Sequence, residues 1–262
     1  MACVSAVAVA QFAPGDDRRS NLDDISALAT EAASRGATLV VFPEYSSWFS
    51  PEAGPRWVEA AEHLDGPFVE RLASLAAELG VHIVAGMLEH STADKVSNTV
   101  VAVAPSGDLV ATYRKIHLYD AFGHRESDWV AAGPILPPET FEWDGFVVGL
   151  QTCYDLRFPE STRRLVDAGA DLVAVPSEWV RGPLKEHHWR TLVTARALEN
   201  TIYVVAADQA PPIGVGNSMV VDPMGVELVT VGEETGVAVA HVTTERIAAV
   251  RQVNPALQLR RL

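Results

Sequence analysis

Short apolar runs alternate with longer amphipathic stretches along this chain. The runs are rich in Val, Ala and Leu and end at polar or turn-forming residues, which is typical of buried strands. We predict strands over residues 4–11, 37–42, 81–87, 96–104, 109–114, 141–150 with a turn in the middle, 172–175, 202–207, 217–221, 226–231 and 237–242.

The amphipathic stretches predict helices between these strands. They cover residues 21–35, 57–79 with a break at Gly66-Pro67, 158–168 and 185–200, with a short helix after the last strand. Asn21 is the predicted N-cap of the first helix, and Gly36 ends it because glycine readily becomes left-handed there. Pro159 suits the first turn of a helix, where its missing N–H costs nothing.

Three tight turns interrupt this alternation of strands and helices. Pro105-Ser106-Gly107-Asp108, Asp144-Gly145 and Asp222-Pro223-Met224-Gly225 each join two predicted strands and are typical of hairpins. Hairpins add antiparallel neighbours, so the sheets are predicted to be mixed. Because no flexible linker divides the chain, we predict one α/β domain over residues 1–262, with two sheets packed face to face and helices outside.

Charge and cysteine content limit the partners of this domain. Its 262 residues carry a net charge of −14, which opposes nucleic acid and anionic membranes, and no run of eighteen apolar residues predicts a membrane span. The apolar start lacks the basic region of a signal peptide, since the first cation is Arg18. Two cysteines, Cys3 and Cys153, make no disulfide framework, so we predict a cytoplasmic protein with Cys3 buried in the first strand.

Cys153 is the leading candidate for chemistry. It follows the apolar run Phe146–Leu150 and precedes the helix that begins near Pro159. A thiol at such a strand-to-helix turn lies near unpaired backbone N–H groups, and a helix N-terminus favours its thiolate. Cys153 is therefore a predicted nucleophile.

Two further predicted strands end in charged residues. Glu44 follows the strand that ends at Phe42, and Lys115 follows the strand that ends at Arg114. Catalytic groups of α/β folds gather at strand ends, so these side chains could meet the thiol. Considered alone, Glu44 could equally be a loop residue and Lys115 a solvated charge at a sheet edge.

Four segments, in this order, resemble the nitrilase or carbon–nitrogen hydrolase superfamily, whose members use a Glu-Lys-Cys triad. They are Phe42-Pro43-Glu44, Arg114-Lys115-Ile116-His117-Leu118, Cys153-Tyr154-Asp155-Leu156-Arg157-Phe158-Pro159-Glu160 and Ala195-Arg196-Ala197-Leu198-Glu199-Asn200. The octet that begins at Cys153 looks most like the omega-amidase and deaminated-glutathione amidase branch. The resemblance implies a four-layer α-β-β-α sandwich that forms homodimers, with residues 251–262 as a C-terminal tail at the interface.

The resemblance also implies roles for individual residues. Glu44 would accept the thiol proton, Lys115 and the Tyr154 backbone N–H would stabilise the oxyanion, and Cys153 would carry a thioester. Glu126 matches an additional family glutamate that orients the lysine or holds the amide nitrogen, although its polar surroundings also suit a surface loop. The chemistry requires neither metal nor organic cofactor, and the histidines show no metal-binding spacing.

Four residues are candidates for substrate binding. Arg157 would bind a substrate carboxylate, or would instead pair with Asp155 or Glu160 and hold the turn. Tyr119, Tyr154 and Trp179 would form the pocket wall, or would fill the core.

The predicted function is hydrolysis of a small linear carboxamide, carrying a carboxylate, to an acid and ammonia. Two other enzymatic readings remain open, because the same triad would hydrolyse a nitrile or an N-carbamoyl group. Outside enzymes, the chain would be an inactive dimeric interaction module. The presence of all three triad residue types argues against that last alternative.

Overall fold

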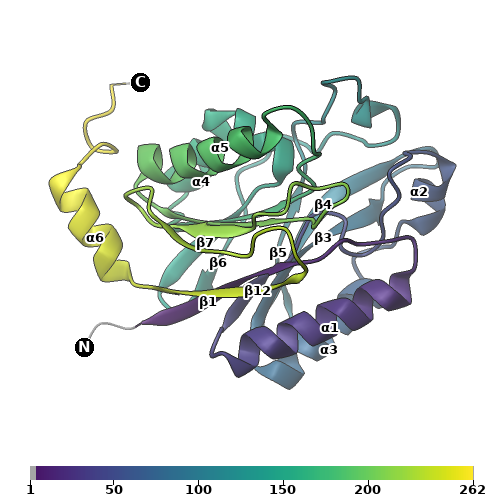
Figure 1. Ribbon diagram of the computed structural model, residues 1–262, viewed down its shortest axis with the longest axis horizontal. Coiled ribbons are helices and arrows are strands. Elements are labelled where there is room, and N and C mark those ends of the chain that lie inside the picture. The colour runs from purple at the N-terminus through teal and green to yellow at the C-terminus, as the bar shows by residue number, and fades with distance from the viewer. Residues whose placement is uncertain (1–3, 262) are drawn as a thin grey trace.

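The computed structural model describes residues 4–261 as two six-stranded sheets packed face to face between helices (Figure 1). The first sheet contains, in spatial order, β12 (Gly236–Val242), β1 (Ser5–Gln11), β2 (Leu39–Val41), β3 (His82–His90), β4 (Val96–Val103) and β5 (Leu109–Arg114). The second contains β11 (Glu227–Thr230), β10 (Met219–Val221), β9 (Tyr203–Asp208), β8 (Leu172–Ser177), β7 (Phe146–Leu150) and β6 (Thr140–Trp143).

Helices form the two outer layers. The α-helices within residues 4–261 are α1 (Arg18–Ser34), α2 (Pro55–Ala60), α3 (Pro67–Leu79), α4 (Pro159–Asp167), α5 (Lys185–Asn200) and α6 (Thr244–Val253). α1 and α3 cover the first sheet, and α4 and α5 cover the second (Figure 1). The predicted α-β-β-α sandwich is confirmed.

Both sheets are mixed, as predicted. β1, β2 and β3 run parallel, and so do β7, β8 and β9, while the outer pairs of each sheet are antiparallel. All three predicted hairpins form, joining β4 to β5, β6 to β7 and β10 to β11. The central parallel strands are therefore covered on both faces and contain continuous apolar runs.

The main core lies between the two sheets. Val7 and Val41 of the first sheet face this layer, together with Val148 and Val205 of the second. The opposite face of each sheet packs against its helices, so alternate residues of one strand enter different cores. This arrangement leaves the strand ends and the loops after them to carry polar groups.

The structure corrects the start of the first helix. Asp17, not Asn21, is the N-cap, and its side chain accepts hydrogen bonds from the N–H groups of Arg19 and Ser20. Asn21 lies inside α1, where its amide exchanges hydrogen bonds with the backbone of Gly15. The helix therefore begins a turn earlier than predicted because Asp17 satisfies its free N–H groups.

The C-terminal region also differs in detail from the prediction. α6 extends to Val253, so the first three residues of the predicted tail, 251–253, are helical. Cys3, predicted to be buried in the first strand, lies outside the described residues. Among residues 4–261, no helix has the length and apolar character needed to cross a membrane.

Candidate active site

Glu44, Lys115 and Glu126 form one buried charged cluster. Lys115 Nζ lies 2.9 Å from Glu44 Oε1 and 3.0 Å from Glu126 Oε2, and its side chain is only 2% exposed. Glu44 follows β2, Lys115 follows β5, and Glu126 begins a 3-10 turn, η1 (Glu126–Asp128). The side chain of Glu126 is 7% exposed, so the alternative of a surface-loop acid is wrong.

Asn98 and Tyr45 complete this cluster, and neither was predicted from the sequence. Asn98 Nδ2 donates to Glu44 Oε1 at 2.6 Å and to Glu126 Oε1 at 3.0 Å. The Tyr45 hydroxyl donates to Glu126 Oε1 at 2.6 Å. These donors compensate the two carboxylates that one lysine cannot neutralise alone.

Electrostatics favour the charged form of this cluster. Burial lowers the pKa of Lys115, but the carboxylates of Glu126 and Glu44 outweigh burial and keep that pKa well above its usual value. Burial raises the pKa of Glu126, yet Lys115 and the surrounding hydrogen bonds hold it below its usual value. Both groups are therefore ionised at neutral pH.

A glycine allows the Glu44 turn to approach β3. Gly86 lies so close that a Cβ atom there would be 2.6 Å from Glu44 Cα and 2.7 Å from Tyr45 N. The backbone N–H of Gly86 also donates to Pro43 O at 3.1 Å. The missing side chain thus positions Glu44 against the sheet.

Cys153 begins a second 3-10 turn, η2 (Cys153–Arg157), between β7 and α4. Its φ angle is 44°, a left-handed conformation that is uncommon outside glycine and is found at functional turns. Asp155 holds the turn by accepting from Thr152 N and from the Tyr113 hydroxyl. Arg196 of α5 donates twice to Leu156 O, which ties the turn to the helix behind it.

The surroundings of Cys153 favour the neutral thiol. Burial and the negative charge of Glu44 raise the pKa of Cys153 well above its usual value, against the opposing effect of Lys115. Cys153 Sγ donates to Glu178 O at 3.3 Å. The thiolate expected from a helix N-terminus is therefore not the favoured form of the free site, because burial penalises an anion that faces Glu44.

A cavity of about 210 Å³ brings these groups together. Lys115, Glu126, Cys153 and Glu178 all line it, with aromatic side chains such as Tyr45 and Trp57 on its wall. Glu44 does not line this cavity, but it contacts two residues that do: its Oε1 lies 2.9 Å from Lys115 Nζ, and its Oε2 accepts from the Glu178 N–H at 2.6 Å. The three strand ends therefore lie around one cavity, and the catalytic roles of Glu44, Lys115 and Cys153 stay predictions.

The four predicted substrate-binding residues gather beside Cys153. Tyr119, Tyr154, Arg157 and Trp179 line a smaller cavity next to the thiol. Among the described residues, Arg157 forms no ion pair with Asp155 or Glu160. The guanidinium carbon of Arg157 instead lies 4.9 Å from the Trp179 ring centre. Trp179 also belongs to the core beneath α5, so its two predicted roles coexist.

Lys185 is a further cation at this cavity that sequence analysis missed. Its Nζ donates to the Tyr119 hydroxyl at 2.6 Å and lies 4.1 Å from the Phe122 ring centre. Burial and the charge of Arg157 lower the pKa of Lys185. A lysine at the start of a predicted helix carries no signal that it turns inward, so only the fold reveals it.

Like Asn98, Tyr45 and Lys185, Glu178 was not predicted from the sequence. It follows β8 and lines both cavities. Burial, together with the nearby carboxylates of Glu44 and Asp208, raises the pKa of Glu178 well above its usual value. Like Glu44, Glu178 follows a buried strand, and this position is the feature of the sequence that could have indicated it.

Known proteins agree with this architecture. Residues 6–252 match the family model described as carbon-nitrogen hydrolase. A protein named deaminated glutathione amidase from Escherichia coli O157:H7 is 39% identical over 97% of both chains. An omega-amidase of Xenopus tropicalis is 31% identical over 97% of this chain and 94% of its own.

Solved structures support the same assignment. A double mutant of a Nesterenkonia amidase in complex with acrylamide superposes with a TM-score of 0.83 at 27% identity, covering 98% of this chain and 94% of that one. A Helicobacter pylori carbon-nitrogen hydrolase, at 22% identity, shares the fold with a TM-score of 0.90 over 99% of this chain and 96% of its own. With a family match that spans nearly the whole sandwich, this chain belongs to the carbon–nitrogen hydrolases.

Proposed function

We propose that this protein is an amidase that cleaves small linear carboxamides to a carboxylic acid and ammonia, with Cys153 as nucleophile. The observation that supports it most strongly is Lys115, held between Glu44 and Glu126 in the cavity that Cys153 lines. The names of the relatives, deaminated glutathione amidase and omega-amidase, agree with this reaction class.

The first half of the proposed reaction forms a thioester. Glu44 takes the proton from the neutral thiol as Cys153 Sγ attacks the amide carbon, so no stable thiolate is needed in the free enzyme. Lys115 and the backbone N–H of Tyr154 stabilise the oxyanion, and one such donor is typically worth about 3–4 kcal/mol of barrier. The C–N bond then breaks, and Glu44 returns its proton to the leaving nitrogen, which departs as ammonia.

The second half regenerates the enzyme. Glu44 accepts a proton from a water molecule whose oxygen attacks the thioester carbon, and Lys115 again stabilises the oxyanion. The C–S bond breaks and the proton returns to Sγ, which restores the neutral thiol. Glu126 positions Lys115 throughout, because it accepts a hydrogen bond from that ammonium group at 3.1 Å.

The substrate is proposed to carry a carboxylate at the end opposite its amide. Arg157 and Lys185 both lie against the Phe122 ring, at 5.4 Å and 4.1 Å from its centre. The ion pairs found among the described residues include neither cation. Two unpaired positive charges beside the nucleophile favour an anionic group of the substrate.

Ammonia release from a charged and a neutral amide tests this proposal. We expect glutaramate to be a better substrate than valeramide, and Cys153→Ala to abolish both reactions. Arg157→Met and Lys185→Met should each raise KM for glutaramate at least about tenfold, since hydrogen bonds to charged groups are worth about 1.5–3 kcal/mol. Their effect on valeramide should stay within about twofold, because it lacks the carboxylate.

Other outcomes would assign a different function. Nitrile turnover without amide turnover would indicate a nitrilase, and carbon dioxide released with ammonia would indicate an N-carbamoyl hydrolase. Absence of both thioester formation and Cys153 alkylation would indicate an inactive module. A homodimer and a cytoplasmic location, the latter suggested by the low cysteine content, remain predictions.

A further inference from the structure

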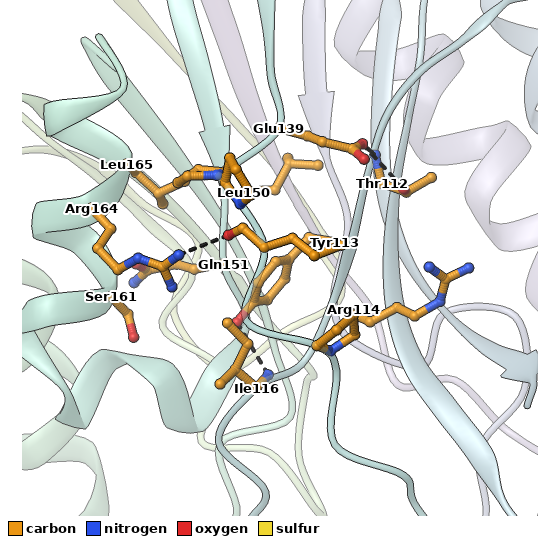
Figure 2. Close-up of a pocket in the computed structure, with 14 residues that line it drawn as sticks. Thr112, Tyr113, Arg114, Ile116, Glu139, Leu150, Gln151, Ser161, Arg164 and Leu165 are labelled. Atoms are coloured by element: carbon orange, nitrogen blue, oxygen red, sulfur yellow. Dashed lines mark hydrogen bonds between the residues drawn. The ribbon is translucent and has the colours of Figure 1, made fainter.

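A further cavity lies next to the nucleophile turn, apart from the two cavities that Cys153 lines. It has a volume of about 80 Å³ and lies between β5, α4 and the loop that leads to β6 (Figure 2). Figure 2 shows Ser161 and Arg164 of α4 on one side and Thr112 of β5 on the other. Among residues 4–261, the wall of this cavity does not include Lys115, Glu126 or Cys153.

Gln151, on the wall of the cavity, carries a buried hydrogen-bond donor that has no partner among the described residues. Gln151 is 1% exposed, and its Oε1 accepts from Thr162 Oγ1 at 2.8 Å. Its Nε2 has no hydrogen-bond partner among the described residues. An unsatisfied buried amide costs about 1–3 kcal/mol. Because Nε2 is not itself exposed to the cavity, the Gln151 amide must turn toward an acceptor atom there before that free energy is recovered.

The charge and the apolar lining of the cavity define what would fit. Arg164 donates to Leu136 O at 2.7 Å. Within residues 4–261, it forms no ion pair with an acidic side chain. Glu139, the acid on the lining, accepts from Thr112 N at 2.9 Å and lies across the cavity in Figure 2. The remaining wall carries Leu136, Leu150 and several prolines, together with Ser161 and with Arg114, whose guanidinium pairs with Glu89. A cation and an amide donor beside apolar side chains match a carboxylate with a short hydrocarbon tail.

We propose that this cavity is a second small-molecule site that binds a short aliphatic carboxylate. The carboxylate accepts from Gln151 Nε2 and pairs with the Arg164 guanidinium, while its hydrocarbon chain packs against Leu136 and Leu150. This ligand is distinct from the amide substrate, and its site does not depend on the proposed reaction.

The site is connected to the turn that holds Cys153. Gln151 is two residues before the nucleophile, and Tyr113 lines the cavity while its hydroxyl donates to Asp155 Oδ2 at 2.6 Å. Asp155 in turn accepts from the N–H of Thr152 at 3.1 Å. A ligand that moves Gln151 or Tyr113 therefore changes the turn, so we expect occupancy to alter kcat.

Saturation-transfer NMR with butyrate tests binding, and n-butylamine is the probe of opposite charge. The background is the double variant Arg157→Met/Lys185→Met, which removes the cations beside Cys153. We expect millimolar binding of butyrate and at least about tenfold weaker binding of n-butylamine, as charge selection requires. Adding Leu136→Trp, which fills the cavity from its exposed rim, should abolish butyrate binding. The matched control Ile135→Trp is 75% exposed and does not line the cavity, so binding should persist.

Three results would overturn the inference. If butyrate binds the wild-type protein but not the double variant Arg157→Met/Lys185→Met, the ligand lies beside Cys153, and the proposed function is unaffected. Equal binding by the Leu136→Trp and Ile135→Trp proteins, or no binding at all, would show that the cavity holds only water. In the wild-type protein, butyrate should change kcat for propionamide at least about twofold, and Leu136→Trp should remove this effect. If butyrate binds but kcat stays unchanged, the cavity is not connected to the turn. Only this kinetic test depends on the proposed function.

Discussion

Lys115 keeps its charge inside the protein because two carboxylates and their donors surround it. A lone buried ammonium would lose its proton, and two buried carboxylates without a cation would be equally unfavourable. Asn98 and Tyr45 supply the remaining hydrogen bonds, so the cluster is complete before any substrate enters. A fixed positive charge of this kind stabilises an oxyanion without reorganisation during the reaction.

Glu178 gives a prediction of pH-dependent stability at the residue scale. Burial and its neighbouring carboxylates raise the pKa of Glu178 in the folded state. Below the unfolded value, about 4.3, both states hold the proton, whereas above it only the folded state does, so stability falls as pH rises. Glu178→Gln should remove this loss, and the variant should gain about 1 kcal/mol or more over wild type between pH 4 and pH 8, measured by urea denaturation.

An exposed acid provides the control for this measurement. Glu52→Gln changes a carboxylate at the surface, and its stability difference from wild type should stay flat over the same pH range. A flat difference for Glu178→Gln as well would mean that the Glu178 carboxyl is ionised in the folded protein.

Residue identities alone indicated part of the site. Cys153, Glu44 and Lys115 each follow a strand, which made them candidates, but the family resemblance was needed to group them and to add Glu126. Asn98 lies within β4, where a polar residue in a strand usually faces solvent, and nothing in the sequence shows that it faces two carboxylates. Lys185 required knowledge of where α5 begins relative to Cys153, which depends on tertiary packing.

At the scale of elements, Gly86 links the position of β3 to that of Glu44. Gly86→Ala would place a Cβ atom 2.6 Å from the Glu44 Cα atom, and both neighbours are backbone that cannot rotate away. We expect a loss of about 1–3 kcal/mol in unfolding free energy and a large fall in kcat, because Glu44 must shift away from Lys115. Denaturant unfolding and ammonia release measure the two effects.

Gly15→Ala is the matched control for that substitution. A Cβ atom at Gly15 meets nothing within 4 Å, so stability should change by no more than about 0.5 kcal/mol. If Gly86→Ala behaved like Gly15→Ala, the close approach of β3 would have no role in positioning Glu44.

Elements were predicted well where the apolar pattern was strong. The three hairpins and the Pro159 start of α4 were confirmed, since their turn residues act locally. The start of α1 was wrong, because Asp17 and Asn21 are both good caps and only packing selects between them. The left-handed conformation of Cys153 could not be predicted, as it depends on Asp155 and Arg196 holding the turn.

At the scale of the whole molecule, the outer layer at α5 leaves apolar side chains exposed. Leu198 is 43% exposed, and Met224 and Val226, on the turn between β10 and β11, are 45% and 51% exposed. A Cβ atom at Gly225, between those two residues, would lie 2.7 Å from Leu198 Cγ, so the turn packs against α5 there; we call these three exposed residues the α5 patch. Contiguous apolar patches of this kind often mark contacts between proteins.

The predicted homodimer should therefore use the α5 patch. A net charge of −14 on each chain opposes association, so burial of apolar surface must drive it, and added salt should strengthen it by screening. Light scattering should give twice the mass of one chain for wild type, and Leu198→Glu should give monomers. Ile135→Glu, which is 75% exposed on a different loop, should stay dimeric. Deleting residues 254–262 tests the tail. If the deletion variant remains dimeric, the tail is not part of the interface. If Leu198→Glu remains dimeric, the α5 patch is not part of it.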